Sequence, residues 1–304
     1  MRYSFKNFDF VGKSKYFYTF SVTITILGII ILGVMGLNYG VDFRAGSSVD
    51  IAVTKNLEAQ HDEIVALIEK EDLGKYNLSI GTDRLTIRFE EILSNDEELK
   101  LKTDFAAAFD PNASMEVNTV DVEIAREMQT DALLAVAIAS IGIVIFVSIR
   151  FEWRFALAAI VALLHDAFIV ISVFSILRLE VDLTFIVAVL TIIGYSINDT
   201  IVIFDRIREN LRFAKIKTKA DLVKLVNDSV SQTMTRSINT VVTVLFAALA
   251  VFIFGGESIR MFSLAMVIGL FAGAYSTIFI ASPLWLLLKS KEKPKTPAKT
   301  QPTV

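Results

Sequence analysis

The chain has 304 residues, 54% of them hydrophobic, and a mean hydropathy of +0.57, which excludes an ordinary soluble domain. It has no cysteine, which excludes disulfides, thiolate metal sites and a cysteine nucleophile, and its two histidines are too few for a histidine-based metal centre. The net charge of −3 decides little, because the charged residues are distributed unevenly.

Long apolar runs account for the high hydropathy. A helix that crosses the bilayer needs about 20 mainly apolar residues. The first run ends without a small-residue cleavage signal, which indicates a retained helix and not a signal peptide. The sequence predicts an α-helical polytopic membrane protein with six transmembrane helices, at Tyr16–Leu37, Ala132–Ile149, Phe155–Leu177, Leu183–Phe204, Ser237–Phe254 and Phe262–Leu288.

Lysine and arginine in the short segments predict the orientation, because these residues accumulate on the cytoplasmic side of membrane proteins. The N-terminal segment, the turn after the second run, the segment after the fourth run and the C-terminal tail are basic and fall on one side. We therefore expect both termini in the cytoplasm. The chain then divides into a cytoplasmic N-terminal segment, a first helix, an extracytoplasmic domain, a five-helix domain and a disordered cytoplasmic tail, at 1–15, 16–37, 38–131, 132–288 and 289–304.

The long segment 38–131 is acidic, with 9 basic and 21 acidic side chains. Alternating and helical patterns follow each other in the order β-α-β-β-α-β, which is typical of a small ferredoxin-like α+β domain. The elements are expected at Ser47–Thr54, Leu57–Leu73, Tyr76–Ile80, Arg84–Glu90, Asp96–Phe109 and Ser114–Asp121. Before the first of them, the segment Val41-Asp42-Phe43-Arg44-Ala45-Gly46 leads into the domain, and Gly46 permits a tight turn there.

The third span carries His165-Asp166 near its middle. This pair either takes part in a proton path or forms a structural pair that hydrogen-bonds a neighbouring helix.

The fourth span becomes polar inside its apolar run, after Gly194, at Tyr195, Ser196, Asn198, Asp199 and Thr200. A carboxylate such as Asp199 costs about 2.5–3.5 kcal/mol at the centre of a membrane helix, so its default interpretation is functional. The polar, basic segment that follows, 205–225, has the apolar stripe of a helix lying along the cytoplasmic surface.

Arg236, at the start of the fifth span, is expected at the same membrane depth as Asp199. The two side chains could form an ion pair, or Arg236 could be an interfacial anchor whose charged end reaches the headgroups. In the sixth span, Gly269 and Gly273 form a G-x-x-x-G pattern that favours close helix packing.

Several of these motifs together resemble the SecF family, the smaller of the paired SecD/SecF auxiliary subunits of the bacterial protein-export translocase. The matching residues extend over nearly the whole chain, with Ala45 as a departure where the family usually has a first glycine. They are Asp42, Phe43 and Gly46 after the first span, His165-Asp166, the run Gly194-Tyr195-Ser196-Ile197-Asn198-Asp199-Thr200 that continues into Asp205-Arg206-Ile207-Arg208-Glu209-Asn210, and Thr235-Arg236-Ser237-Ile238-Asn239-Thr240.

The resemblance implies a membrane architecture similar to that of resistance-nodulation-division exporters. It implies a subunit of the bacterial inner membrane that pairs with SecD, associates with the SecYEG channel and YajC, contacts lipid and the translocating polypeptide, and binds no nucleic acid. Protons would be the coupling ion, with no other cofactor, and the proton-motive force would promote late translocation and release. The family's span-four aspartate and span-five arginine match Asp199 and Arg236, and we add Asp166 to the predicted proton path.

Two other functions remain open on the residues alone. One is half of a proton-coupled small-molecule exporter, and the other is a structural scaffold of the translocase that conducts no protons. We expect no enzyme, because the sequence has no nucleotide-binding glycine loop, no nucleophile–base arrangement and no metal-ligand spacing.

Overall fold

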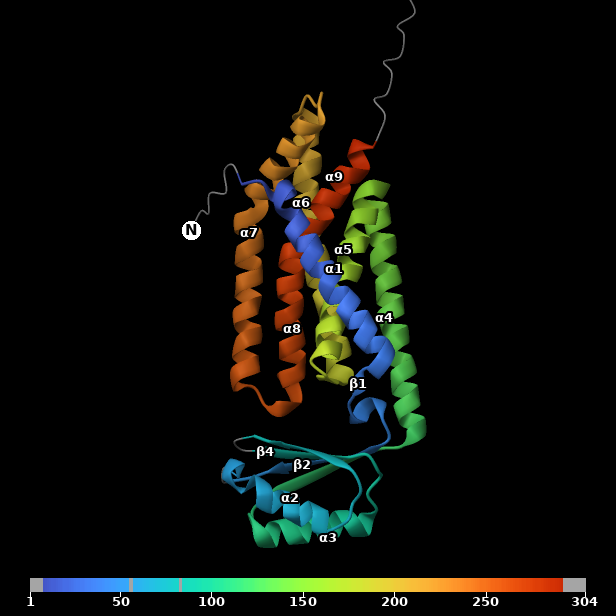
Figure 1. The fold of residues 1–304 in the computed structure, drawn as a ribbon, viewed down its shortest axis with the longest axis vertical. Coiled ribbons are helices and arrows are strands. Elements are labelled where there is room, and N and C mark those ends of the chain that lie inside the picture. The colour runs from blue at the N-terminus through green and yellow to red at the C-terminus, as the bar shows by residue number, and fades with distance from the viewer. Residues whose placement is uncertain (1–7, 55–56, 82–83, 292–304) are drawn as a thin grey trace, which may run out of the picture.

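The computed structural model describes residues 8–54, 57–81 and 84–291. Within those residues, six helical segments are long and apolar enough to cross a membrane, which confirms the predicted six-span fold. They pack as one bundle with a smaller α/β domain at one end (Figure 1). The segments are α1 (Phe10–Met35), α4 (Val122–Arg150), α5 (Trp153–Ile176), α6 (Leu183–Phe213), α7 (Lys219–Phe254) and α8 (Glu257–Ser276), the last continuing through a π-helical segment, η3 (Thr277–Ala281), into α9 (Ser282–Ser290).

The spanning helices extend beyond the predicted apolar runs, because polar flanking residues continue or cap them. Asp9 accepts a hydrogen bond of 2.9 Å from the Gly12 N–H and so caps α1 ahead of its apolar run. Asp121 accepts hydrogen bonds from two backbone N–H groups at the start of α4. The acidic residues before Ala132 are therefore helical.

The segment 205–225 differs from the predicted surface helix. α6 continues to Phe213 and α7 begins at Lys219, so the two helices form a hairpin. The apolar stripe of this segment is buried in the same hydrophobic cluster as Ile203 and Ile207 of α6. The stripe packs against α6 and not against lipid, and it consists of Leu222, Leu225 and Val226.

The α/β domain has the β-α-β-β-α-β order that the sequence predicts, which confirms the ferredoxin-like α+β fold. Its elements are β2 (Gly46–Ala52), α2 (His61–Lys70), β3 (Tyr76–Ile80), β4 (Arg84–Phe89), α3 (Asn95–Ala108) and β5 (Ser114–Val120), with a short 3-10 turn, η2 (Glu58–Gln60), ahead of α2. The strands form an antiparallel sheet in the order β3-β4-β2-β5.

The core of the α/β domain lies between the sheet and its two helices. α2 and α3 cover the face of the sheet that is turned away from the bundle (Figure 1). The buried side chains include Val49, Ile51, Ile87, Leu101 and Phe105. Residues 82–83, between the second and third predicted strands, and parts of the predicted terminal segments, 1–7 and 292–304, lie outside the described residues.

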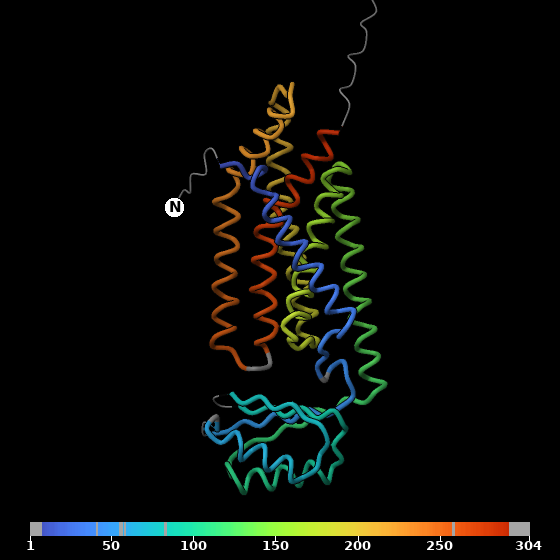
Figure 2. Tube along the Cα trace, in the orientation of Figure 1, coloured from blue at the N-terminus to red at the C-terminus, as the bar shows by residue number. Residues whose placement is uncertain are grey.

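Two short strands pair at the end of the bundle next to the α/β domain (Figure 1). β1 (Asn38–Tyr39) follows α1 and pairs in parallel with β6 (Glu180–Val181), which precedes α6. After β1, the chain passes through a 3-10 turn, η1 (Val41–Phe43), into β2 of the α/β domain (Figure 2). Gly46 has a φ of +151°, and a Cβ there would overlap the Phe89 carbonyl oxygen, so this tight turn requires glycine.

Candidate functional site

Asp199 lies on the polar stretch of α6 and contacts α7. Its Oδ1 accepts a hydrogen bond of 2.6 Å from the Ser237 hydroxyl. Its Oδ2 is buried and has no hydrogen-bond partner among the described residues. A carboxylate can accept several hydrogen bonds, so this side chain has unused capacity. Asp199 is therefore held by a single donor in the middle of a spanning helix.

A small cavity of about 20 Å³ adjoins this carboxylate. A space of that size holds about one water molecule, and its walls must be partly polar for the water to stay. Three helices form the walls, which contain Tyr195, Ser196 and Asp199 of α6, Thr240 of α7 and Gly273 of α8. The site can therefore offer Asp199 a water as a proton donor or acceptor.

The two glycines of the G-x-x-x-G pattern bring α8 against α6 at the same place. A Cβ added at Gly269 would overlap the side chain of Ile192. A Cβ at Gly273 would lie 3.4 Å from the Cβ of Ser196 and 3.6 Å from Asp166 Oδ2. The pattern thus permits the close approach that encloses the cavity.

Arg236 does not form the ion pair that equal depth suggested. Its side chain is exposed, and no ion pair within 4.0 Å joins it to Asp199. Successive residues of a helix are rotated by about 100°, and it is Ser237 that faces α6. Of the two alternatives for Arg236, the exposed side chain fits the interfacial anchor, and the neighbouring Ser237 makes the hydrogen bond to Asp199.

Asp166 of α5 has a side chain that is 0% exposed and accepts hydrogen bonds from three directions. The Ser196 hydroxyl of α6 donates to its Oδ2 at 2.5 Å, and the Ser276 hydroxyl of α8 donates to the same oxygen at 2.9 Å. Its Oδ1 lies 2.9 Å from Nδ1 of His165. A buried carboxylate with this many donors is fully satisfied.

His165 extends the same network to α1. Its Nε2 lies 2.8 Å from the Ser21 hydroxyl and 3.2 Å from the Tyr275 hydroxyl, which in turn lie 3.1 Å apart. The network therefore joins α1, α5, α6 and α8. Ser196 both bonds Asp166 and lines the Asp199 cavity, so one serine and a water-sized space separate the two acids.

Sequence reasoning gave no role to four hydroxyl groups of this site. Such residues also occur in membrane helices where they only hydrogen-bond their own backbone, as Thr191 does with the Val187 carbonyl. The one usable signal was the polarity of the helix stretches around the acids. The four residues are Ser21, Ser237, Tyr275 and Ser276.

The other predicted motif residues lie near the two ends of α6. At its start, Asp42 Oδ2 accepts a hydrogen bond of 3.0 Å from the Leu183 N–H. Phe43 is buried, and its carbonyl accepts a hydrogen bond from Gln129 of α4. Near its other end, Asp205 pairs with Arg150 at 3.1 Å and with Arg208 at 3.0 Å, and Arg206 pairs with Glu209 at 2.8 Å.

Two of the predicted residues do not reach the cavity. Gly194 and Asn198 are exposed on α6, and a Cβ added at Gly194 would meet nothing within 4 Å. Tyr195, which lines the cavity, is also 39% exposed. This face of α6 is therefore open in the single chain.

Two models of known protein families match most of the chain. A family model described as protein export membrane protein SecD/SecF, C-terminal, matches residues 100–291. A second model, the SecD/SecF GG motif, matches residues 30–56, which include the Ala45-Gly46 pair.

Both SecF proteins and longer SecDF proteins are similar to this chain. The protein translocase subunit SecF of Alicyclobacillus acidocaldarius is 45% identical over 95% of this chain and 95% of its own length. The protein translocase subunit SecDF of Bacillus subtilis is 46% identical over 97% of this chain. The chain spans only 40% of the length of that SecDF.

Solved structures of SecDF share the fold. The crystal structure of the translocon-associated SecDF from Thermus thermophilus matches 93% of this chain and 39% of its own length, at 31% identity and a TM-score of 0.83. SecDF in a super-membrane-facing form matches the same share of this chain at a TM-score of 0.65. By the family model over residues 100–291 and its close SecF relatives, the chain belongs to the SecD/SecF family of protein-export membrane proteins.

Proposed function

We propose that this protein is an auxiliary subunit of the Sec protein-export translocase that pairs with SecD and uses the proton-motive force to promote late translocation and release. The observation that carries this proposal is Asp199. It lies in a spanning helix with one donor on Oδ1, an Oδ2 that has no partner among the described residues, and a cavity for about one water beside it. Protons are the coupling ion, and the activity is transport and not catalysis.

The physical basis is the opposing effect of burial and of nearby donors on a carboxylate. Low polarity favours the neutral acid, whereas a hydrogen-bond donor or an arginine favours the charged form. The exposed Arg236 side chain is long and begins beside Ser237, so it can approach Asp199 in another arrangement of the helices. Each charge that crosses the membrane supplies about 2.3 kcal/mol per 100 mV.

Asp166 is the second acid of the proposed proton path. Ser196 bonds Asp166 and lines the cavity of Asp199, so a hydroxyl can pass a proton between the two. The three hydrogen bonds on Asp166 fit a fixed relay group, whereas the single bond on Asp199 fits the group that is loaded and released.

The exposed polar groups at membrane depth support pairing with SecD. Asn198 of α6 and both Arg236 and Asn239 of α7 are exposed in the single chain. Polar side chains within a membrane normally face protein or water and not lipid. A partner bundle over this face would cover them. SecYEG, YajC and the translocating polypeptide enter as further partners through the family resemblance.

The proposed location is the bacterial inner membrane with both termini in the cytoplasm. α1 begins and α9 ends at the end of the bundle opposite the α/β domain (Figure 1). Basic residues lie at the same end of the bundle: Arg150 near the end of α4, and Arg208 and Arg212 near the end of α6. Such residues accumulate on the cytoplasmic side. The acidic α/β domain then lies outside, where a secreted chain emerges.

The test is export in cells depleted of the native subunit. Asp199→Asn keeps the shape of the side chain and removes its titration, so we expect it to fail to restore export. Asp228→Asn, an exposed acid on α7, is the matched control and should restore it. Wild-type export by the Asp199→Asn variant at wild-type abundance would refute the proposal.

A non-conducting scaffold is the one other function that an observation favours. The hydrogen bond between Ser237 and Asp199 holds α6 to α7 and would do so without any proton movement. Proton flux into vesicles that contain this chain and SecD separates the two, because a scaffold gives none. The small-molecule exporter has no support from the family assignment.

A further inference from the structure

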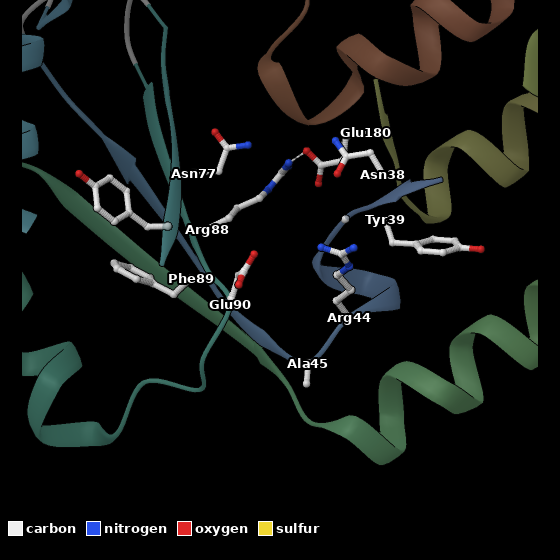
Figure 3. A pocket seen from close by; sticks show the side chains of 11 residues that line it. Asn38, Tyr39, Arg44, Ala45, Asn77, Arg88, Phe89, Glu90 and Glu180 are labelled. Carbon is white, nitrogen blue, oxygen red and sulfur yellow. Dashed lines mark ion pairs between the residues drawn. The ribbon is translucent and has the colours of Figure 1, made fainter. Parts of the chain in front are cut away.

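An ion pair joins the α/β domain to the membrane bundle. Arg88 of β4 contacts Glu180 of β6 through its guanidinium (Figure 3). The two side chains are 32% and 20% exposed, so the pair is partly shielded from water. Arg88 belongs to the sheet of the α/β domain, whereas Glu180 belongs to the connection between α5 and α6.

The backbone around Glu180 fixes its position relative to α6. β6 pairs with β1, and the Gly40 N–H donates a hydrogen bond of 2.9 Å to the Val181 carbonyl. A Cβ at Gly40 would overlap Glu180 Oε1, so the absent side chain makes room for the carboxylate. α6 starts immediately afterwards, capped by Asp182 at 2.8 Å from the Phe185 N–H. Glu180 must therefore move with the outer end of the helix that carries the site.

The surroundings of the pair allow it to open. It borders two cavities, of about 420 and 280 Å³, and both are lined by Arg88 and Glu180. Arg44 and Glu90 line the larger cavity, so each charge has an oppositely charged side chain nearby after separation (Figure 3). Nε of Arg88 is buried without a partner among the described residues, so the closed state does not satisfy this side chain fully.

We propose that Arg88 and Glu180 form a releasable contact that positions the α/β domain over the end of α6 and transmits movement of α6 to that domain. The source of the movement rests on the proposed function, through the Asp199 site on the same helix. The contact itself does not, because its residues and cavities are independent of that site.

The first experiment measures the position of the domain directly. The chain has no cysteine, so cysteines at two exposed positions, Leu99 of α3 and Leu177 at the end of α5, give one spin-label pair. Distances are measured on the full-length chain with SecD in lipid nanodiscs. The label-to-label distance should be short when the domain is held against the bundle and long when it is released. Glu180→Arg removes the ion pair, so the ratio of the short-distance (near) to the long-distance (far) population should fall about five-fold. An unchanged distribution would overturn the proposal.

Charge exchange separates this contact from a general disturbance of the fold. Arg88→Glu alone should act like Glu180→Arg, and the double variant should restore the near population. Arg84→Glu is the matched control, because Arg84 is exposed on the same strand and has no ion pair among the described residues. It should leave the distances unchanged. Failure of the double variant to restore the near population would count against the pair.

Export by the same variants tests the transmission. Each single reversal should lower the export rate, and the double variant should recover it. Altered distances with full export would overturn the role of the contact in transmitting movement of α6. Should Asp199→Asn export at the wild-type rate, the proposed function fails, while the distance measurements still decide whether this contact exists and opens.

Discussion

The buried network of Asp166 gives a quantitative prediction about the stability of the bundle. Asp166→Ala removes the acceptor of three hydrogen bonds, from Ser196, Ser276 and His165. In membrane proteins a side-chain hydrogen bond contributes about 0.6 kcal/mol on average and about 1.7 kcal/mol at most. Three bonds therefore predict a loss of about 2 kcal/mol, with a ceiling of about 5 kcal/mol.

Removing one hydrogen-bond donor should lower the free energy of unfolding much less than Asp166→Ala does. Ser196→Ala and Ser276→Ala each remove one bond, so each should lower the free energy of unfolding by about 0.6–1.7 kcal/mol. Unfolding in mixed detergent micelles, followed by circular dichroism on the full-length chain, measures all variants on one scale.

The matched control for this series is Ser175→Ala on the same helix. The Ser175 hydroxyl is buried and has no hydrogen-bond partner among the described residues. Removing an unsatisfied buried hydroxyl should be neutral or stabilising. The reasoning is refuted if Asp166→Ala destabilises the bundle no more than Ser175→Ala, because the network would then contribute nothing.

Two further predictions concern helix packing and the α/β domain. Gly269→Ala should lower the free energy of unfolding by about 1–3 kcal/mol through overlap with Ile192, whereas Gly142→Ala, where a Cβ meets nothing within 4 Å, should be neutral or stabilising in the same detergent assay. Lys100 lies 2.5 Å from Glu71 and holds the pKa of that carboxyl below its ordinary value of 4.5. Glu71→Gln should therefore speed amide exchange in the α/β domain at neutral pH. Because the charged form is the stabilised one, the difference from wild type should disappear as the pH falls below 4.5 and through the lowered pKa.

The sequence predicted the elements of this protein well because burial imposes regular patterns. Membrane-length apolar runs predicted all six spans, and period-two alternation predicted the first and last strands of the domain, β2 and β5. The G-x-x-x-G pattern at Gly269 and Gly273 also predicted a close helix contact correctly. Helix ends were the weak point, because Asp9 and Asp121 cap helices outside the apolar runs.

Contacts between helices could not be predicted in the same way, because they depend on rotation about each helix axis. Equal depth left open whether Arg236 pairs with Asp199 or is an interfacial anchor, and the rotation of α7 turns the neighbouring Ser237 toward Asp199. The Arg88–Glu180 pair is beyond sequence reasoning for another reason. Its two residues lie on separate elements that only the arrangement of the α/β domain over the bundle brings together.

Proton movement through Asp199 is tested most directly by flux across vesicles that contain the full-length chain and SecD under an imposed proton gradient. Wild-type protein should carry protons, Asp199→Asn should reduce the flux to that of empty vesicles, and Asp228→Asn should carry protons like wild type. Wild-type flux through the Asp199→Asn variant would contradict a role for this carboxylate in carrying protons.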